Sequence, residues 1–201
     1  MTRETFEVGS FAVNCSVISH AGRVFVVDPG ADGEEIVGAV GKFGSAAPDI
    51  LLTHGHFDHI GAIPFLQERW PAAKVYVTAA DSRMFGHPLN MYPPEYPGID
   101  APRNVAEPKA LEEAGIVVLG TPGHTPGGVC YYFPEDGVLF SGDTLFRESV
   151  GRTDLPGGDM RTLMKSLAEI VKLPGETLVV PGHGMETTIA HERENNIYIA
   201  S

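Results

Sequence analysis

Four side chains of the kinds that bind metal ions lie within six consecutive residues. They are His54, His56, Asp58 and His59, in the segment ILLTHGHFDHIGA. Imidazole nitrogens and carboxylate oxygens are common ligands of zinc and other divalent metals. Three imidazoles and a carboxylate buried this close together without a shared cation would be costly, because each would lose its contact with water. The segment therefore predicts a metal site.

The order of these residues predicts two metal centres. A β-branched and leucine run leads into the segment, and a helical pattern follows it. If the chain leaves the strand extended, His54 and His56 project to one side, because side chains alternate along extended backbone. Asp58 and His59 stand at the start of the helix and point elsewhere. We expect the second pair to serve a second centre.

Two metal ions need more than four ligands, and three further donors follow predicted strands. His124 follows IVVLGTPG, Asp143 follows VLFSG, and His183 follows LVVPG. Neighbouring glycines allow tight backbone turns at these positions. Ligand sites gather at strand ends, where a rigid frame presents loop residues. Each residue alone is better explained as part of a turn, but all three at strand ends beside the His54–His59 segment favour ligation.

The elements that must position these donors follow from the apolar pattern. Short apolar runs alternate with turns and amphipathic segments, which predicts an α/β layered fold with more than one sheet. We predict strands near Phe6–Val8, Cys15–Ser19, Val24–Asp28, Ile50–Thr53, Lys74–Thr78, Ile116–Leu119, Gly128–Phe133, Val138–Ser141 and Thr177–Val180. We predict helices near Gly33–Phe43, Ile60–Arg69, Asp159–Leu173 and Glu186–Asn195. Segment 86–109, with six prolines, is either a functional cover or a surface excursion.

Composition limits the partners and the compartment. The net charge of −12 disfavours nucleic acid and anionic membranes, because affinity for a polyanion depends on Lys and Arg. Cys15 and Cys130 form no CxxC pair, so two buried free thiols in a reducing compartment are expected. No signal-peptide pattern or membrane-spanning apolar run is present, which predicts a cytoplasmic protein. A monomer or a homodimer is expected.

The complete donor pattern resembles that of the metallo-β-lactamase superfamily. The pattern is His54-x-His56-x-Asp58-His59, followed by His124, Asp143 and His183, and the resemblance also includes VVDPGAD. It implies an αββα four-layer sandwich, with two mixed β-sheets flanked by helices, as a single domain over residues 1–201. It implies a first metal on His54, His56 and His124. It implies a second metal on Asp58, His59 and His183, with Asp143 bridging both.

A narrower resemblance suggests a reaction. GDTLFRESVGRTDLPGGD and PGHGMETTI are most similar to the glyoxalase II group, in particular its short bacterial members. Those members lack an added helical domain, and 18 residues follow His183 here. The resemblance implies hydrolysis of a thioester such as S-lactoylglutathione by a hydroxide bridging two divalent metals, with Asp58 and Asp143 acting in catalysis. Zinc is expected, and iron or manganese would also suit these donors.

The substrate is less well defined by the resemblance. Arg152 stands where the family has a basic residue that holds the glutathione glycine carboxylate, and a guanidinium suits a carboxylate. Asp154 stands where the family commonly has a tyrosine, so a structural Arg152–Asp154 ion pair is the rival interpretation. Asp28 is expected in a turn or beside a ligand, and Thr53 and Thr125 either orient ligands or have structural roles.

Other functions of the same fold stay open. Persulfide dioxygenases share the GRTD sequence and use one iron, on residues corresponding to His56, His124 and Asp143. A lactonase, a phosphodiesterase and a non-catalytic metal-dependent scaffold are further alternatives. β-Lactam hydrolysis is disfavoured, because lactam-cleaving members with zinc commonly have a cysteine in place of the bridging acid. Both cysteines of this chain lie outside the ligand loops.

Overall fold

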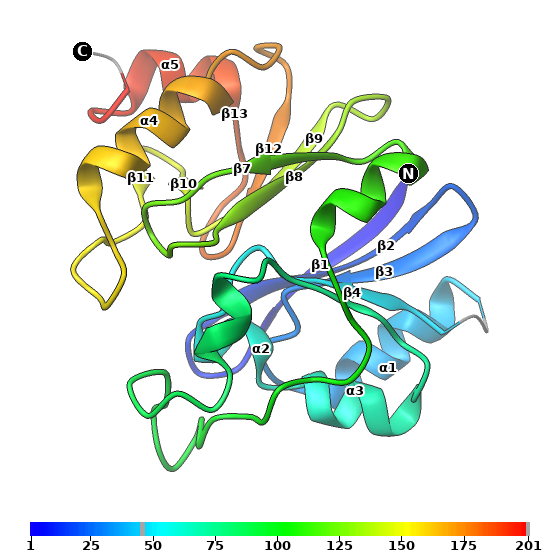
Figure 1. Ribbon diagram of the computed structural model, residues 1–201. Helices are drawn as coiled ribbons and strands as arrows, with labels where there is room; N and C mark the ends of the chain where they lie inside the picture. The colour runs from blue at the N-terminus through cyan, green and yellow to red at the C-terminus, as the bar shows by residue number, and fades with distance from the viewer. Residues whose placement is uncertain (45–46, 200–201) are drawn as a thin grey trace. The chain divides into compact units, whose positions relative to one another are not determined.

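The computed structural model describes residues 1–44 and 47–199 (Figure 1). Contacts between Cα atoms divide the chain into an N-terminal unit, Met1–Ala110, and a C-terminal unit, Leu111–Ser201. Each unit contains a mixed β-sheet with helices packed on it, so each sheet includes both parallel and antiparallel neighbours.

The N-terminal unit is built on a six-stranded sheet of order β1-β2-β3-β4-β5-β6. Its first three strands pair antiparallel, and the next three continue in parallel from β3. Parallel neighbours end at the same edge, so the segments that follow β3 and β4 emerge side by side. The strands are β1 (Thr2–Val8), β2 (Val13–His20), β3 (Arg23–Val27), β4 (Asp49–Leu51), β5 (Val75–Tyr76) and β6 (Val105–Ala106).

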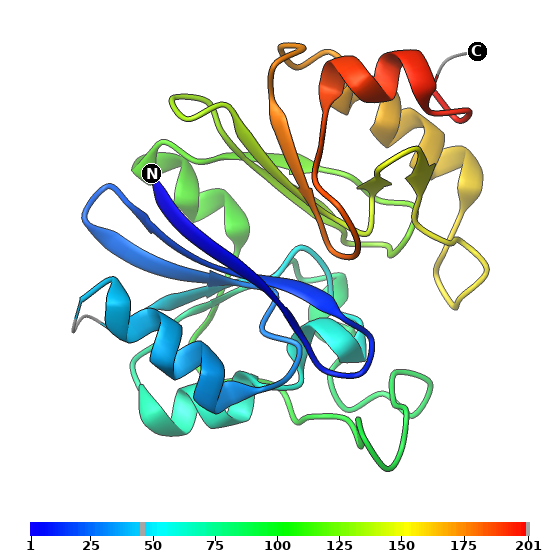
Figure 2. The same cartoon turned by 180° about the vertical axis from the view of Figure 1, so that it is seen from behind.

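Two helices cover one face of this sheet (Figure 2). Helix α1 (Gly33–Lys42) places Ile36 and Val40 in the core, and helix α3 (Ile63–Arg69) adds Leu66. The apolar positions of α1 recur at helical spacing, which gives the helix one buried face. The short helix α2 (Phe57–Ile60) and the 3₁₀ helix η1 (Asp81–Met84) complete the unit, and the 3₁₀ helix η2 (Pro108–Ala114) spans the boundary.

The C-terminal unit has a five-stranded sheet of order β13-β12-β9-β8-β7 and a two-stranded sheet of β10 and β11. Helix α4 (Met160–Ile170) is capped at its N-terminus by Asp159, whose carboxylate accepts a hydrogen bond from the Thr162 amide. Helix α5 spans Ile189–Asn195. Both helices pack on the five-stranded sheet. The strands are β7 (Val117–Gly120), β8 (Val129–Phe133), β9 (Val138–Gly142), β10 (Leu145–Phe146), β11 (Ser149–Val150), β12 (Leu178–Pro181) and β13 (Thr187–Thr188).

Every strand predicted from the sequence has a counterpart, but two predicted helices differ. The predicted helix Ile60–Arg69 is wrong as one element, because it divides into α2 and α3. The Ala62 amide donates to the Pro29 carbonyl instead of continuing the helix, and Pro64 has no amide hydrogen. The predicted helix Glu186–Asn195 begins only at Ile189, because the preceding residues pair with β12.

Segment 86–109 is more ordered than predicted. It includes β6 and a bridge between Tyr92 and Tyr96. Phe11, from the turn between β1 and β2, contacts the rings of Tyr92 and Tyr96 at 5.2 Å and 5.6 Å between centroids. These contacts join the segment to the rest of the N-terminal unit.

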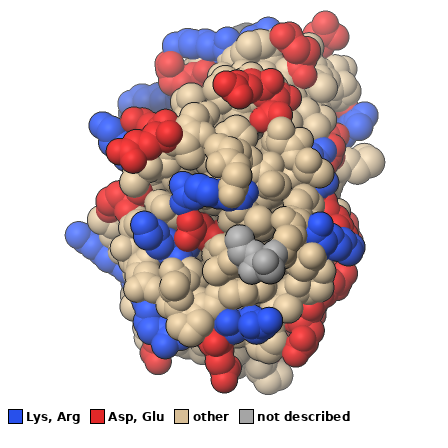
Figure 3. Space-filling view, turned by 90° about the vertical axis from the view of Figure 1, so that its right-hand side faces the viewer, with Lys and Arg blue, Asp and Glu red and all other residues tan. Residues whose placement is uncertain are grey.

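The structure confirms the expectation for the two cysteines. Cys15 and Cys130 are both free and buried, as predicted. On the face shown in Figure 3, basic side chains lie among acidic and uncharged ones. Within residues 1–44 and 47–199, none of the helices has the length and apolar composition needed to cross a bilayer.

Candidate metal centre

The four clustered donors lie just after β4, as the strand-end prediction requires. His54 and His56 occupy the loop, and Asp58 and His59 belong to α2. The His54 ring centroid lies 4.8 Å from that of His56 and 4.1 Å from that of His59. All four residues are buried. The N-terminal unit therefore concentrates three imidazoles and a carboxylate at one place.

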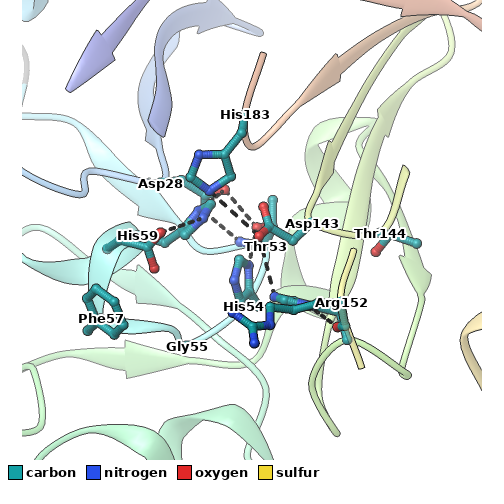
Figure 4. A network of polar contacts seen from close by, with 12 residues as sticks. Asp28, Thr53, His54, Gly55, Phe57, His59, Asp143, Thr144, Arg152 and His183 are labelled. Carbon is teal, nitrogen blue, oxygen red and sulfur yellow. Dashed lines mark hydrogen bonds and ion pairs between the residues drawn. The ribbon is translucent and has the colours of Figure 1, made fainter. Parts of the chain in front are cut away.

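Asp28 and Thr53 orient two of these histidines (Figure 4). The Thr53 amide donates to Oδ1 of Asp28 at 2.8 Å, and the Thr53 hydroxyl donates to Oδ2 at 2.7 Å. The hydroxyl proton is thereby used, so its oxygen accepts from Nδ1 of His54 at 3.0 Å. That contact assigns the ring proton to Nδ1 and leaves Nε2 as the nitrogen with a lone pair.

The same carboxylate approaches His59. Oδ2 of Asp28 lies 3.1 Å from Nδ1 of His59, and Nε2 of that ring lies 3.9 Å from Oδ2 of Asp58. Asp28, His54 and His59 offer donor atoms within 4.8 Å of one another, so Asp28 could be considered a ligand itself. Thr53 already donates a hydrogen bond to each oxygen of Asp28. This favours a role in orienting the ligands over direct metal binding. Its φ of 49° is unusual for a residue other than glycine.

The C-terminal unit brings its three predicted donors together. His124 follows β7, Asp143 follows β9, and His183 follows β12. Oδ2 of Asp143 lies 3.4 Å from Nε2 of His124 and 3.6 Å from Nε2 of His183. Figure 4 shows the side chains of Asp143 and His183 next to each other. Two donors bound at about 2.1 Å to one tetrahedral ion are about 3.4 Å apart. One carboxylate oxygen therefore has a suitable spacing from two imidazole donors.

The loop after β11 (Ser149–Val150) holds His124 through backbone. Nδ1 of His124 hydrogen-bonds with the carbonyl oxygen of Arg152 at 2.7 Å, which leaves Nε2 facing Asp143. Gly151 permits this arrangement, because a Cβ there would lie 1.8 Å from the Asp143 carbonyl oxygen and 3.1 Å from Nδ1 of His124. The contact of the Arg152 carbonyl with His124 was not predicted from the sequence, since a backbone group leaves no residue-type signal.

The Arg152 side chain forms the ion pair that the rival interpretation predicts. Its Nε and Nη2 donate to the two carboxylate oxygens of Asp154 at 2.7 Å and 2.8 Å. Both side chains are exposed. Hydrogen bonding to the guanidinium lowers the pKa of Asp154 from 3.8 to about 2. A guanidinium has five N–H donors, so this pair leaves donors for another anion.

A family model for the metallo-β-lactamase superfamily matches residues 8–183, a range that contains all seven predicted donors. The chain belongs to the metallo-β-lactamase superfamily. It has the metallo-β-lactamase fold, with mixed sheets and flanking helices, which confirms the predicted α/β class. It is a metal-dependent hydrolase of this superfamily.

Three similar proteins cover almost the whole chain. The hydroxyacylglutathione hydrolase GloC of Haemophilus influenzae is 31% identical over 211 residues, which cover 100% of this chain and 99% of GloC. The structure of the B3 metallo-β-lactamase BLEG-1 is 34% identical with a TM-score of 0.89, over 100% of both chains. The structure of TTHA1623 in a di-iron-bound form is 36% identical with a TM-score of 0.89, over 97% of this chain and 99% of that one.

The donors fit divalent metals, and metal binding in a di-iron relative supports the same conclusion. Nδ1 of His54 and Nδ1 of His124 each contact an oxygen, so Nε2 is the nitrogen of each ring that would bind a metal. Histidine and carboxylate donors together accept zinc, iron or manganese, so the donor types alone do not select one metal.

Replacing Gly151 should disturb this centre. We expect Gly151→Ala to lower metal content and activity at least tenfold, because the added Cβ would displace the Asp143 carbonyl and the His124 ring. Metal per chain is measured by mass spectrometry after purification at neutral pH. Gly38→Ala in α1 is the control, because a Cβ there meets nothing within 4 Å. Equal metal content in the two variants would contradict the prediction.

Removing the Arg152 guanidinium should change the titration of Asp154. We expect Arg152→Ala to raise the pKa of Asp154 from about 2 toward 3.8, followed by carbon NMR of the side-chain carboxyls. Because the folded-state pKa is depressed, the pair stabilises the fold above 3.8 and loses this effect as the pH falls toward 2. Asp159, whose pKa is lowered by Thr162, should keep its titration. An ordinary pKa for Asp154 in the unmodified protein would show that the pair does not form.

Proposed function

We propose that this protein is a thioesterase that hydrolyses an S-acyl thiol such as S-lactoylglutathione with two divalent metal ions. The observation that carries the proposal is the similarity to GloC over the full length of both chains. The spacing of Asp143 from two histidines supports it, because the distances to His124 and His183 are each close to the distance between two ligands of one ion.

The proposed ligands follow the family pattern. His54, His56 and His124 would hold one ion. Asp58, His59 and His183 would hold the second, and Asp143 would be shared. Zinc is the proposed metal, although the similarity to a di-iron protein keeps iron in consideration.

The reaction needs no side-chain nucleophile. Bound divalent metals would lower the pKa of a water molecule toward neutrality and stabilise negative charge on a carbonyl oxygen. Asp58 would orient the attacking water by accepting a hydrogen bond from it. Asp28 keeps Thr53 and His54 in place during this step. Burial raises the pKa of the Cys15 thiol, which disfavours a thiolate nucleophile at that residue.

Arg152 is the proposed contact for a substrate carboxylate. It follows the Asp143 loop, and its carbonyl contacts His124, so its side chain starts next to a proposed ligand. Asp154 would hold the guanidinium by two nitrogens while the remaining N–H groups bind the substrate. The Arg152–Asp154 ion pair is then compatible with substrate binding.

Two pockets provide alternatives for the rest of the substrate. A pocket of about 560 Å³ beside His183 is lined by Phe146, Arg147, Glu148, Gly184 and Met185. A pocket of about 790 Å³ in the N-terminal unit is lined by Phe57, Phe65 and Tyr96, together with Asp32, Glu34, Glu35 and Glu95. The lining residues described for the larger pocket include no Lys or Arg, so it suits an apolar group better than a carboxylate.

β-Lactam hydrolysis is the second candidate. The similarity to BLEG-1, a B3 metallo-β-lactamase, extends over all of both chains. The position of the cysteines disfavours this reaction by the family pattern, and both thiols are buried. The two candidates differ in the bond that is cleaved.

The metal count and the substrate assay together test the proposal. We expect two metal ions per chain and hydrolysis of S-lactoylglutathione. Asp143→Asn should lower the metal content and reduce turnover at least a hundredfold, because an amide is a weaker ligand than a carboxylate. Asp136→Asn, in the exposed turn between β8 and β9, is the control and should retain activity.

Other results would select another reaction. A fully active Asp143→Asn variant would contradict the mechanism. Hydrolysis of a β-lactam in the absence of thioester hydrolysis would favour the second candidate. One iron per chain, with oxygen uptake in the presence of glutathione persulfide, would favour a dioxygenase. If all three assays are negative, lactones and phosphodiesters are the next substrates to test.

Arg152 should affect substrate binding more than turnover. We expect Arg152→Ala to raise KM for S-lactoylglutathione at least tenfold with a smaller change in kcat, because a carboxylate contact stabilises the bound substrate and the transition state alike. Steady-state kinetics measure both constants. Arg147→Ala is the comparison, since Arg147 lines the pocket beside His183. A larger rise in KM for that variant would assign the carboxylate to Arg147 instead.

A further inference from the structure

The peptide groups between the proposed ligands are held by two side chains that the reaction does not use. Gly55 lies between His54 and His56, and its amide donates to Oδ2 of Asp81 at 3.0 Å. Its carbonyl oxygen accepts from Nδ2 of Asn90 at 2.8 Å. Both hydrogen-bonding groups of this glycine are therefore bound by side chains about 26 and 35 residues further along the chain.

Asn90 extends the same support to the next ligand. The Phe57 amide, one residue before Asp58, donates to Oδ1 of Asn90 at 3.1 Å. The Asn90 amide group thus contacts the backbone on both sides of His56. Because one side chain binds both positions, a change in its placement would move the His54–Asp58 loop as a whole.

Burial makes these contacts important for the loop. Gly55 is buried, Asp81 is fully buried, and Asn90 is 6% exposed. A buried backbone group needs a protein partner, because water cannot replace a lost hydrogen bond there. The loop lies between β4 and α2, so a regular strand or helix does not satisfy these groups.

The two supporting side chains are themselves fixed. Asp81 begins η1, and its amide donates to Oγ1 of Thr78 at 3.3 Å. Nδ2 of Asn90 also donates to the carbonyl oxygen of Met84, the last residue of η1, at 3.1 Å. A Cβ at Gly55 would lie 2.8 Å from the Asp81 carbonyl oxygen and 3.2 Å from Sδ of Met84. The loop and η1 are therefore packed closely.

We infer that Asp81 and Asn90 are positioning residues for the metal ligands, acting through the backbone of Gly55 and Phe57. The inference rests on the proposed function, because it assumes that His54, His56 and Asp58 bind metal. It also assigns a role to the start of segment 86–109, which contains Asn90. That part of the segment supports the metal loop.

Loss of these contacts should weaken metal binding more than it weakens the fold. We expect Asn90→Ala to lower the affinity for Zn²⁺ at least tenfold, measured by competition with a chromophoric chelator. The absorption spectrum of the Co²⁺-loaded protein should change in position or intensity, because the ligand geometry changes. The thermal midpoint of the metal-free protein is measured in parallel, so that loss of the fold is seen separately.

Asn196→Ala is a matched control in the C-terminal unit. Asn196 is fully buried, and its side chain also makes three hydrogen bonds, to the Ser149 carbonyl, the Glu192 carboxylate and the Tyr198 amide. We expect a similar fall in the thermal midpoint but near-normal Zn²⁺ affinity. Equal losses of affinity in the two variants would overturn the inference, because they would reflect general destabilisation.

Conservative variants test the contacts one at a time. Asp81→Asn keeps an acceptor for the Gly55 amide without the charge, so it should retain most of the affinity that Asp81→Ala loses. Unchanged affinity in both Asn90→Ala and Asp81→Ala would overturn the positioning role and leave the proposed function intact. If the unmodified protein bound no Zn²⁺ or Co²⁺, the proposed function would fail, and this inference with it.

Discussion

A histidine presents one chosen nitrogen to a metal when another group holds its ring and keeps the proton on the other nitrogen. This constraint explains much of the geometry around the proposed centre. Nδ1 of His54 faces the Thr53 hydroxyl, Nδ1 of His59 faces Asp28, and Nδ1 of His124 contacts the Arg152 carbonyl. In each ring Nε2 is then the nitrogen directed away from the supporting group. The contacts at Nδ1 therefore determine that Nε2 is the ring nitrogen that would bind a metal.

The side chains that orient His54 and His59 lie just after the ends of β3 and β4. Asp28 follows β3 and Thr53 follows β4, and these strands are parallel neighbours, so their ends lie at one edge. The adjacency lets a single carboxylate reach both Thr53 and His59. A buried carboxylate needs this many partners, since a buried polar group without a hydrogen bond costs about 1–3 kcal/mol. The network therefore satisfies Asp28 while it orients the two rings.

The strands that precede the proposed donors were predicted well, because an apolar run and the residue that ends it leave a strong local signal. A run such as VLFSGD shows a buried strand and an acid at its end without reference to any other part of the chain. Asp81 and Asn90 leave no such signal. Each contacts Gly55 across a long stretch of sequence, and Asn90 lies in a proline-rich segment whose path the apolar pattern does not predict. The division between α2 and α3 was missed for a similar reason, since it depends on the contact of Ala62 with Pro29.

The supports differ in how they constrain the sequence. Asp28 and Thr53 act through their side chains, so substitution at either position changes the orientation of His54 directly. Arg152 supports His124 through its carbonyl, which any residue type could supply. The Arg152 side chain is therefore not needed for the contact to His124. Residues 152 and 154 can vary without loss of that contact. If Arg152 binds the substrate carboxylate as proposed, substitutions at residues 152 and 154 would change substrate preference while the backbone contact to His124 keeps the geometry of that ligand.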